Sequence, residues 1–149
     1  MKTSLFALLF LTAFSFSCHK ERPHKGHSCN DCPKDQACTM EYRTLALSIR
    51  NAGGEPIALD SFHTLQVRTG KIVNNQFSNW EDSVFKSNGN YPYWSDSYTK
   101  VTKRHGEEVH FLGYKNGEQV VKQILMVGFD CCHVVAESQN TDLILNLEN

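Results

Sequence analysis

A pair of adjacent cysteines, Cys131 and Cys132, restricts the fold of this chain more than any other feature. The pair stands in a strand-like apolar run and is followed by His133. Three further cysteines lie near the other end of the chain: Cys29, Cys32 and Cys38. Because successive strand residues point to opposite faces, we expect one of the pair to face inward and the other outward or toward the N-terminal segment. A disulfide from this pair to an N-terminal cysteine would close most of the chain into one loop.

The N-terminus has the pattern of a secretory signal. Lys2 supplies one cation, Leu5–Phe16 is almost wholly apolar, and Ser15 and Ser17 are the small residues of a cleavage site. An apolar run of this length is too short to cross the roughly 30 Å hydrocarbon core of a bilayer, so cleavage is predicted rather than insertion. We therefore expect residues 1–17 to be removed as a signal peptide.

Two kinds of cleavage agree with the residues that end this signal. Ser15 and Ser17 satisfy the small-x-small rule of ordinary secretion. Cys18, directly after the apolar run and before a polar segment, resembles the lipobox of bacterial lipoproteins. That resemblance implies a lipid on Cys18 that holds the protein in the bacterial outer membrane. Lys20-Glu21 is similar to the signal that sends some of these lipoproteins to the cell surface, so the periplasmic and the surface face both stay open.

The number of cysteines predicts a free thiol. The chain has six cysteines, so an odd number remains if Cys18 carries lipid. Cys38 lies just before the first predicted strand and is the favoured partner of Cys131 or Cys132. A loop of about 93 residues closed in this way would stabilise the fold by roughly 4 kcal/mol in the chain-entropy treatment. One thiol would then be left beside His133, or would pair between molecules.

Residues 18–40 have the composition of a flexible tether. Large apolar side chains are almost absent, so the segment cannot bury enough surface to offset its ordering entropy. Its candidate metal ligands are His24, His27, Cys29 and Cys32. Imidazoles and thiolates at such spacing suit zinc or copper. A redox pair in Cys29-x-x-Cys32 and structural disulfides, which are usual in an oxidising compartment, are the other two readings.

Residues 41–149 are predicted to form one β-rich domain. Glu41–Arg50 alternates between two sets of side chains with the period of a half-buried strand, and Asn51–Pro56 has the glycines and proline of a turn. Phe62–Arg68 alternates in the same way. Asn116-Gly117 between two apolar-rich runs is a strong signal for a hairpin with a type I′ turn.

Further strands are predicted before and after that hairpin. Tyr98–Lys103 and Val109–Tyr114 precede it, Gln119–Val127 follows it, and Asp142–Leu147 closes the domain. No helix of convincing length is predicted anywhere. About seven short strands separated by turns favour an all-β fold, an antiparallel β-sandwich of the immunoglobulin-like or transthyretin-like kind, over any α/β design.

A family resemblance supports the same fold. The strand followed by Asn51-Ala52-Gly53-Gly54-Glu55-Pro56-Ile57-Ala58-Leu59 resembles the opening of carboxypeptidase regulatory-like, transthyretin-like β-sandwich domains, and Gly89-Asn90-Tyr91 is similar to their Gly-x-Tyr. The resemblance covers residues 41–147. It implies a sandwich that serves as a structural or binding module and brings no catalytic residues.

Residues 70–99 have little periodicity and are predicted to be a long loop rich in aromatic side chains. Four of these are candidates for a platform that binds a glycan or peptide: Trp80, Tyr91, Tyr93 and Trp94. Aromatic rings offer flat apolar faces and hydrogen-bonding tips, which suit such ligands. The competing and favoured reading is that these rings fill the core of the sandwich.

The remaining patterns exclude several function classes. No Gly-x-Ser-x-Gly elbow, P-loop or dinucleotide fingerprint is present. His105, Glu107, Glu108 and His110 lack the His-Glu-x-x-His order of zinc proteases. A net charge of −1 without a basic stretch predicts no nucleic-acid partner. The sequence thus favours a noncatalytic envelope lipoprotein that binds a protein or glycan, with zinc or copper binding by the tether as the alternative.

Overall fold

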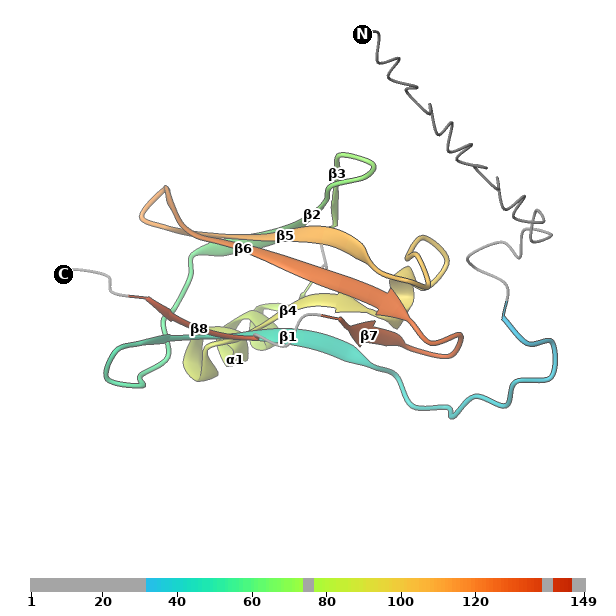
Figure 1. The fold of residues 1–149 in the computed structure, drawn as a ribbon. Coiled ribbons are helices and arrows are strands. Elements are labelled where there is room, and N and C mark those ends of the chain that lie inside the picture. The colour runs from blue at the N-terminus through green and yellow to red at the C-terminus, as the bar shows by residue number, and fades with distance from the viewer. Residues whose placement is uncertain (1–31, 74–76, 138–140, 146–149) are drawn as a thin grey trace, which may run out of the picture.

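The computed structural model describes residues 32–73, 77–137 and 141–145, which form a two-layer β-sandwich (Figure 1). One sheet has the strand order β4 (Asn90–Ser95), β1 (Thr44–Asn51) and β8 (Asp142–Leu145). The other has the order β3 (Lys71–Val73), β2 (Ser61–Gln66), β5 (Glu107–Lys115), β6 (Glu118–Phe129) and β7 (Val134–Ala136). The predicted all-β sandwich is confirmed. Neighbouring strands are antiparallel except β1 and β8, which pair in parallel.

The β5–β6 hairpin is the longest pairing between two strands of the sandwich. It turns at Asn116 and Gly117, whose φ angles of 53° and 81° are those that a type I′ turn requires. The hairpin predicted from these two residues is therefore confirmed. The turn predicted over Asn51–Pro56 also connects β1 to the chain that leads into β2.

A helix, α1 (Asn79–Asn88), occupies part of the predicted aromatic loop, so the prediction of a chain without helices is wrong. Ser78 caps its N-terminus by accepting from the Glu81 N–H, while the Glu81 carboxylate accepts from the Ser78 N–H. Gly89 ends it with a φ of 70°. None of the helical residues is fully buried, which explains why apolar periodicity did not reveal the helix. None of the helices in the described ranges is long and apolar enough to cross a membrane.

The strand predicted at Tyr98–Lys103 is also wrong. A single turn of 3₁₀ helix, η1 (Asp96–Tyr98), follows β4, and turns continue to Gly106. The Thr102 hydroxyl donates to the Tyr98 carbonyl (2.7 Å) and accepts from the Trp94 indole (2.9 Å). These short-range bonds satisfy polar groups that a strand would have presented to a neighbour.

Aromatic side chains from β4 fill the centre of the sandwich. Tyr91, Tyr93 and Trp94 are fully buried between the two sheets. Their ring faces cannot contact a ligand. The prediction of a ligand platform is therefore wrong for these three residues, which belong to the core. Trp80, the fourth candidate, lies on α1 and remains 73% exposed.

Two of these tyrosines form a matched pair for mutation. The Tyr91 hydroxyl donates to the Ile57 carbonyl and accepts from the Leu59 N–H, both at 2.8 Å. The Tyr93 hydroxyl is equally buried but has no hydrogen-bond partner in the described part of the chain. A buried hydroxyl without a partner lowers the stability of the fold. Removing one partner of a buried hydrogen bond lowers it by about 1 to 3 kcal/mol.

We therefore expect Tyr91→Phe to lower the free energy of unfolding by about 1 to 3 kcal/mol, and Tyr93→Phe to leave it unchanged or raise it by up to about 1 kcal/mol. Burial raises the pKa of Tyr93 to about 12. The ionisation of Tyr93 therefore leaves the free energy of unfolding unchanged below pH 10 and lowers it as the pH rises from 10 toward 12. Tyr93→Phe should accordingly weaken the alkaline loss of stability. Urea unfolding at pH 7 and pH 11 measures both effects, and equal losses in the two variants would contradict the assignment.

Candidate functional site

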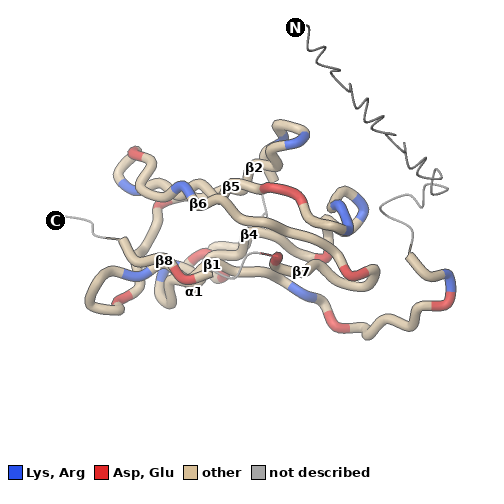
Figure 2. Tube along the Cα trace, in the orientation of Figure 1, with Lys and Arg blue, Asp and Glu red and all other residues tan. Residues whose placement is uncertain are grey.

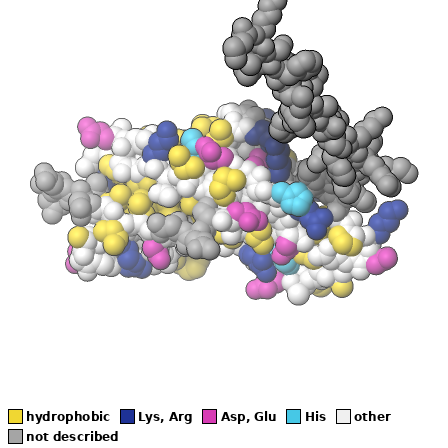
Figure 3. Space-filling model, in the orientation of Figure 1, with side chains coloured by type: hydrophobic (Ala, Val, Ile, Leu, Met, Phe, Trp, Pro, Cys, Tyr) yellow, Lys and Arg dark blue, Asp and Glu magenta, His cyan; other side chains and the backbone are white. Residues whose placement is uncertain are grey.

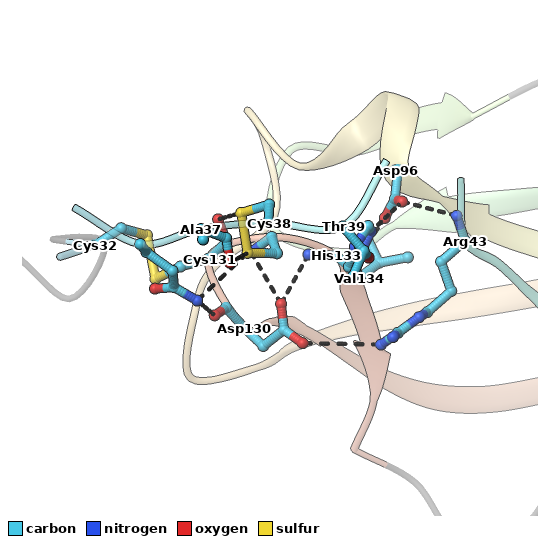
Figure 4. The surroundings of a disulfide bond; sticks show 12 residues. Cys32, Ala37, Cys38, Thr39, Arg43, Asp96, Asp130, Cys131, His133 and Val134 are labelled. Atoms are coloured by element: carbon cyan, nitrogen blue, oxygen red, sulfur yellow. Dashed lines mark hydrogen bonds and ion pairs between the residues drawn. A yellow bond between two sulfur atoms is a disulfide. The ribbon is translucent and has the colours of Figure 1, made fainter. Parts of the chain in front are cut away.

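One end of the sandwich is built around two disulfides that attach the N-terminal segment to the turn between β6 and β7 (Figure 4). Cys32 is bonded to Cys131, and Cys38 is bonded to Cys132. The Cα atoms are 5.5 Å and 5.3 Å apart, which is the usual separation for a disulfide. The second bond joins Cys38, the partner favoured from the sequence, to Cys132 of the adjacent pair.

The prediction of a leftover thiol beside His133 is wrong, because both adjacent cysteines pair with the N-terminal segment. The strand β6 ends at Phe129, so the alternation of strand side chains does not extend to Cys131 and Cys132. Cys131 has a φ of 81°, which turns the backbone and lets both sulfur atoms reach the same segment. Cys18 and Cys29 lie outside the described residues.

Asp130 organises this turn. Its Oδ1 atom accepts from the N–H groups of Cys132 (2.9 Å) and His133 (2.7 Å), and its own N–H donates to the His133 carbonyl (3.0 Å). The hydrogen bond from the His133 N–H is the main cause that keeps the pKa of Asp130 below its usual value, while partial burial opposes the shift. Arg43 Nη1 lies 3.8 Å from Asp130 Oδ2. Both side chains are nearly half exposed, so this ion pair contributes little stability.

A buried imidazole and a partly buried carboxylate lie next to the disulfide-bonded turn (Figure 4). His133 is 6% exposed, and its Nδ1 atom is 2.7 Å from Oδ2 of Asp96. Asp96 also accepts from the N–H groups of Arg43 (2.7 Å) and Val134 (2.8 Å). Burial would raise the pKa of Asp96, but the hydrogen bonds from His133, Val134 and Arg43 outweigh it and hold the pKa below its usual value. Asp96 therefore joins three separate segments: the start of β1, the end of β4 and the β6–β7 connection.

Thr39 completes a row of three side chains. Its hydroxyl and His133 Nε2 share a hydrogen bond of 2.9 Å, so the order is hydroxyl, imidazole and carboxylate (Figure 4). That order occurs in Ser-His-Asp hydrolases, where an oxyanion site and a substrate cleft accompany it. The cleft described below is lined by none of these three residues. We interpret the row as a clamp that holds the N-terminal segment on the domain.

Sequence reasoning identified the cysteines and His133 but missed Thr39, Arg43 and Asp96. Asp96 is 37 positions from His133, and Thr39 is 94 positions from it. No local motif links residues at such distances, and only the disulfide-closed fold places them side by side. The one available signal was that Cys38 and Thr39 are adjacent, so a disulfide at Cys38 brings Thr39 to the same turn.

The metal site predicted in the tether loses a ligand in the folded protein. The Cys32 sulfur is bonded to Cys131 and is not available as a thiolate. The other three predicted ligands, His24, His27 and Cys29, lie outside the described residues. Within the ranges that the structure describes, no group of three or more His, Cys, Asp or Glu side chains could hold a metal ion.

Comparison of the chain with protein-family models, with curated proteins and with solved structures finds no match. Its function is therefore inferred from its own residues and their geometry.

Proposed function

We propose that this protein is a noncatalytic module of the bacterial cell envelope, anchored by a lipid on Cys18, whose β-sandwich binds a partner protein or a glycan. The observation that carries the proposal is the pair of disulfides between the N-terminal segment and the sandwich. Disulfides persist in oxidising compartments such as the periplasm and the cell surface. They agree with the secretory signal and lipobox-like cysteine at the start of the chain.

The disulfides also suit a domain held close to a membrane. The chain between Cys18 and Cys32 can span at most about 50 Å when fully extended. Any force on the anchor would reach the domain through Cys32 and Cys38, which are bonded to it covalently, before it reached β1. The sandwich would then stay within a fixed reach of the lipid without depending on the pairing of its first strand.

The noncatalytic part of the proposal is supported by the use that the fold makes of the hydroxyl, imidazole and carboxylate near the disulfides. The Thr39–His133–Asp96 row joins the N-terminal segment to the domain. On the face shown in Figure 3, apolar and charged side chains are interspersed, which is typical of a solvated surface. The resemblance to carboxypeptidase regulatory-like domains implies a binding or structural module and stays a prediction. In the described residues the zinc or copper alternative has no group of three or more candidate ligands to support it.

Metabolic labelling tests the anchor. When the full chain is expressed in a bacterium with an outer membrane and fed a palmitate analogue, we expect the label in the wild-type protein and its complete loss in Cys18→Ala. Cys29→Ala is the matched control, because it removes a nearby cysteine of the same segment and should keep the label. Label that persists in Cys18→Ala, or its absence from the wild type, would contradict the proposed anchor.

A further inference from the structure

A cleft of about 660 Å³ lies at the β3 edge of the larger sheet. Its walls come from two segments: the end of β2 with its turn into β3, and the turns that follow η1. The volume falls in the range of clefts that bind small ligands. The disulfide-clamped end contributes no residue to it.

Positive charge is concentrated in this cleft. Four cations line it: Arg68, Lys71, Lys100 and Lys103. Figure 2 shows blue segments on the turn that follows β2 and on the loop that leads into β5. The whole chain has a net charge of −1, so the cleft is a local positive region on a nearly neutral protein. A concave surface lined by one sign of charge focuses its field on a ligand of the opposite sign.

Three of the four cations are uncompensated within the described part of the chain. Arg68 forms an ion pair with Glu107 (3.1 Å), whereas none of the described acidic side chains forms an ion pair with Lys71, Lys100 or Lys103. All three lysines are exposed, so their ammonium groups can reach a ligand in the cleft.

Glu107 holds the two walls of the cleft together from beneath. Its carboxylate is almost completely buried and accepts from Gln66 Nε2 (2.9 Å), Arg68 Nε (3.1 Å) and the Lys103 N–H (3.1 Å). Arg68 Nη2 also donates to the Val101 carbonyl (2.9 Å). The two segments are therefore fixed relative to each other without a ligand, which reduces the entropy lost on binding.

The cleft also has apolar surface between its charges. Ile72 and Val101 line it and are 55% and 49% exposed. Tyr98 lies in the same lining and packs against Trp94, with ring centroids 5.0 Å apart. A ligand that matches this surface has C–H faces between negative groups, as a charged sugar has. β3 is only three residues long, so it offers few main-chain hydrogen bonds to an added peptide strand.

We propose that this cleft binds an anionic saccharide, a sugar chain that carries sulfate, phosphate or carboxylate groups. The lysines recognise the negative groups as point charges, which demands no particular orientation of each group. The apolar residues contact the ring faces. This inference rests on the proposed binding function of the sandwich and names the class of its ligand.

Sulfated dextran oligosaccharides are a suitable probe, with neutral dextran of the same length as the reference. Their affinity for the full-length chain in a neutral detergent is measured by calorimetry at low salt. We expect binding of the sulfated form only, and a loss of about tenfold or more in the triple variant Lys71→Gln/Lys100→Gln/Lys103→Gln. The control Lys34→Gln/Lys115→Gln/Lys122→Gln removes the same charge outside the cleft and should change the affinity less than about threefold.

Four results would overturn the proposal: equal losses in the two triple variants, no binding by the wild type, tighter binding of an acidic peptide, or binding of inorganic sulfate as tight as that of the oligosaccharide. Binding to vesicles of anionic phospholipid that exceeds binding to neutral vesicles, and that is lost in Lys71→Gln/Lys100→Gln/Lys103→Gln, would assign the cleft to lipid headgroups and overturn the proposal as well. Because Lys115 is partly buried and the other substituted lysines are exposed, both variants should keep a melting temperature close to that of the wild type. Failure of this test leaves the lipid label on Cys18 unaffected, so it is distinguishable from failure of the proposed anchor.

Discussion

Removal of both disulfides is expected to lower the free energy of unfolding by about 7 kcal/mol, whereas removal of either one alone should cost only about 2 to 3 kcal/mol. The reason is that the two bonds overlap along the chain, because the loops that they close share residues 38–131. Cys38–Cys132 and Cys32–Cys131 join positions 94 and 99 residues apart, so the first bond to form closes a loop that contains β1 to β6. With that loop closed, the second bond adds only a ring of about ten residues, and the entropy it removes from the unfolded chain is smaller.

Three variants test this overlap by urea unfolding under non-reducing conditions. Two remove one bond each, Cys32→Ser/Cys131→Ser and Cys38→Ser/Cys132→Ser, and the third combines all four substitutions. A loss of about 7 kcal/mol is about half or more of the stability of an ordinary domain, so the fourfold variant should have a much lower midpoint. If either pair variant lost as much stability as the fourfold variant, the two bonds would not share the loop that the structure indicates.

Asp96→Ala is expected to cost about 1 to 3 kcal/mol, the usual cost of leaving hydrogen-bonding groups without a partner in the folded protein. The substitution leaves the N–H groups of Arg43 and Val134 without their acceptor and removes the partner of His133 Nδ1. Asp82→Ala is the matched control, because Asp82 pairs with Lys86 on the exposed surface of α1 and should contribute no more than about 0.5 kcal/mol. A loss below about 1 kcal/mol for Asp96→Ala would contradict its role as the joint between three segments.

The same residue predicts how stability depends on pH. Burial of Asp96 is outweighed by hydrogen bonds from His133, Val134 and Arg43, so its pKa in the folded protein lies below the usual value of about 4. A carboxyl group of this kind stabilises the fold above its unfolded pKa, and the contribution is lost as the pH falls through the folded pKa. Unfolding measured from pH 7 to pH 3 should therefore show an acid loss that Asp96→Ala reduces. Asp82→Ala should keep the full acid loss.

Local interactions explain which parts of the fold were predictable. Side chains that alternate along β1 and β2 and the Asn116-Gly117 turn act over a few residues, and they were read correctly. Ser78 and Glu81 are also a local signal, since a serine followed three residues later by a glutamate is a helix-capping pattern. This pattern marks the start of α1, whereas apolar periodicity does not, because none of the residues of α1 is fully buried.

Strand periodicity and turn residues were enough to predict the β-sandwich, and secretion stays a prediction from the N-terminal pattern. Strand periodicity and turn residues follow from backbone geometry within a few positions, and cysteine usage reflects the compartment. Only the tertiary structure decided that Cys131 and Cys132 both bond to the N-terminal segment, that Asp96 and Thr39 meet at His133, and that four cations share one cleft. Each of these joins residues that are far apart in the chain, and their distances are set only when the two sheets pack together.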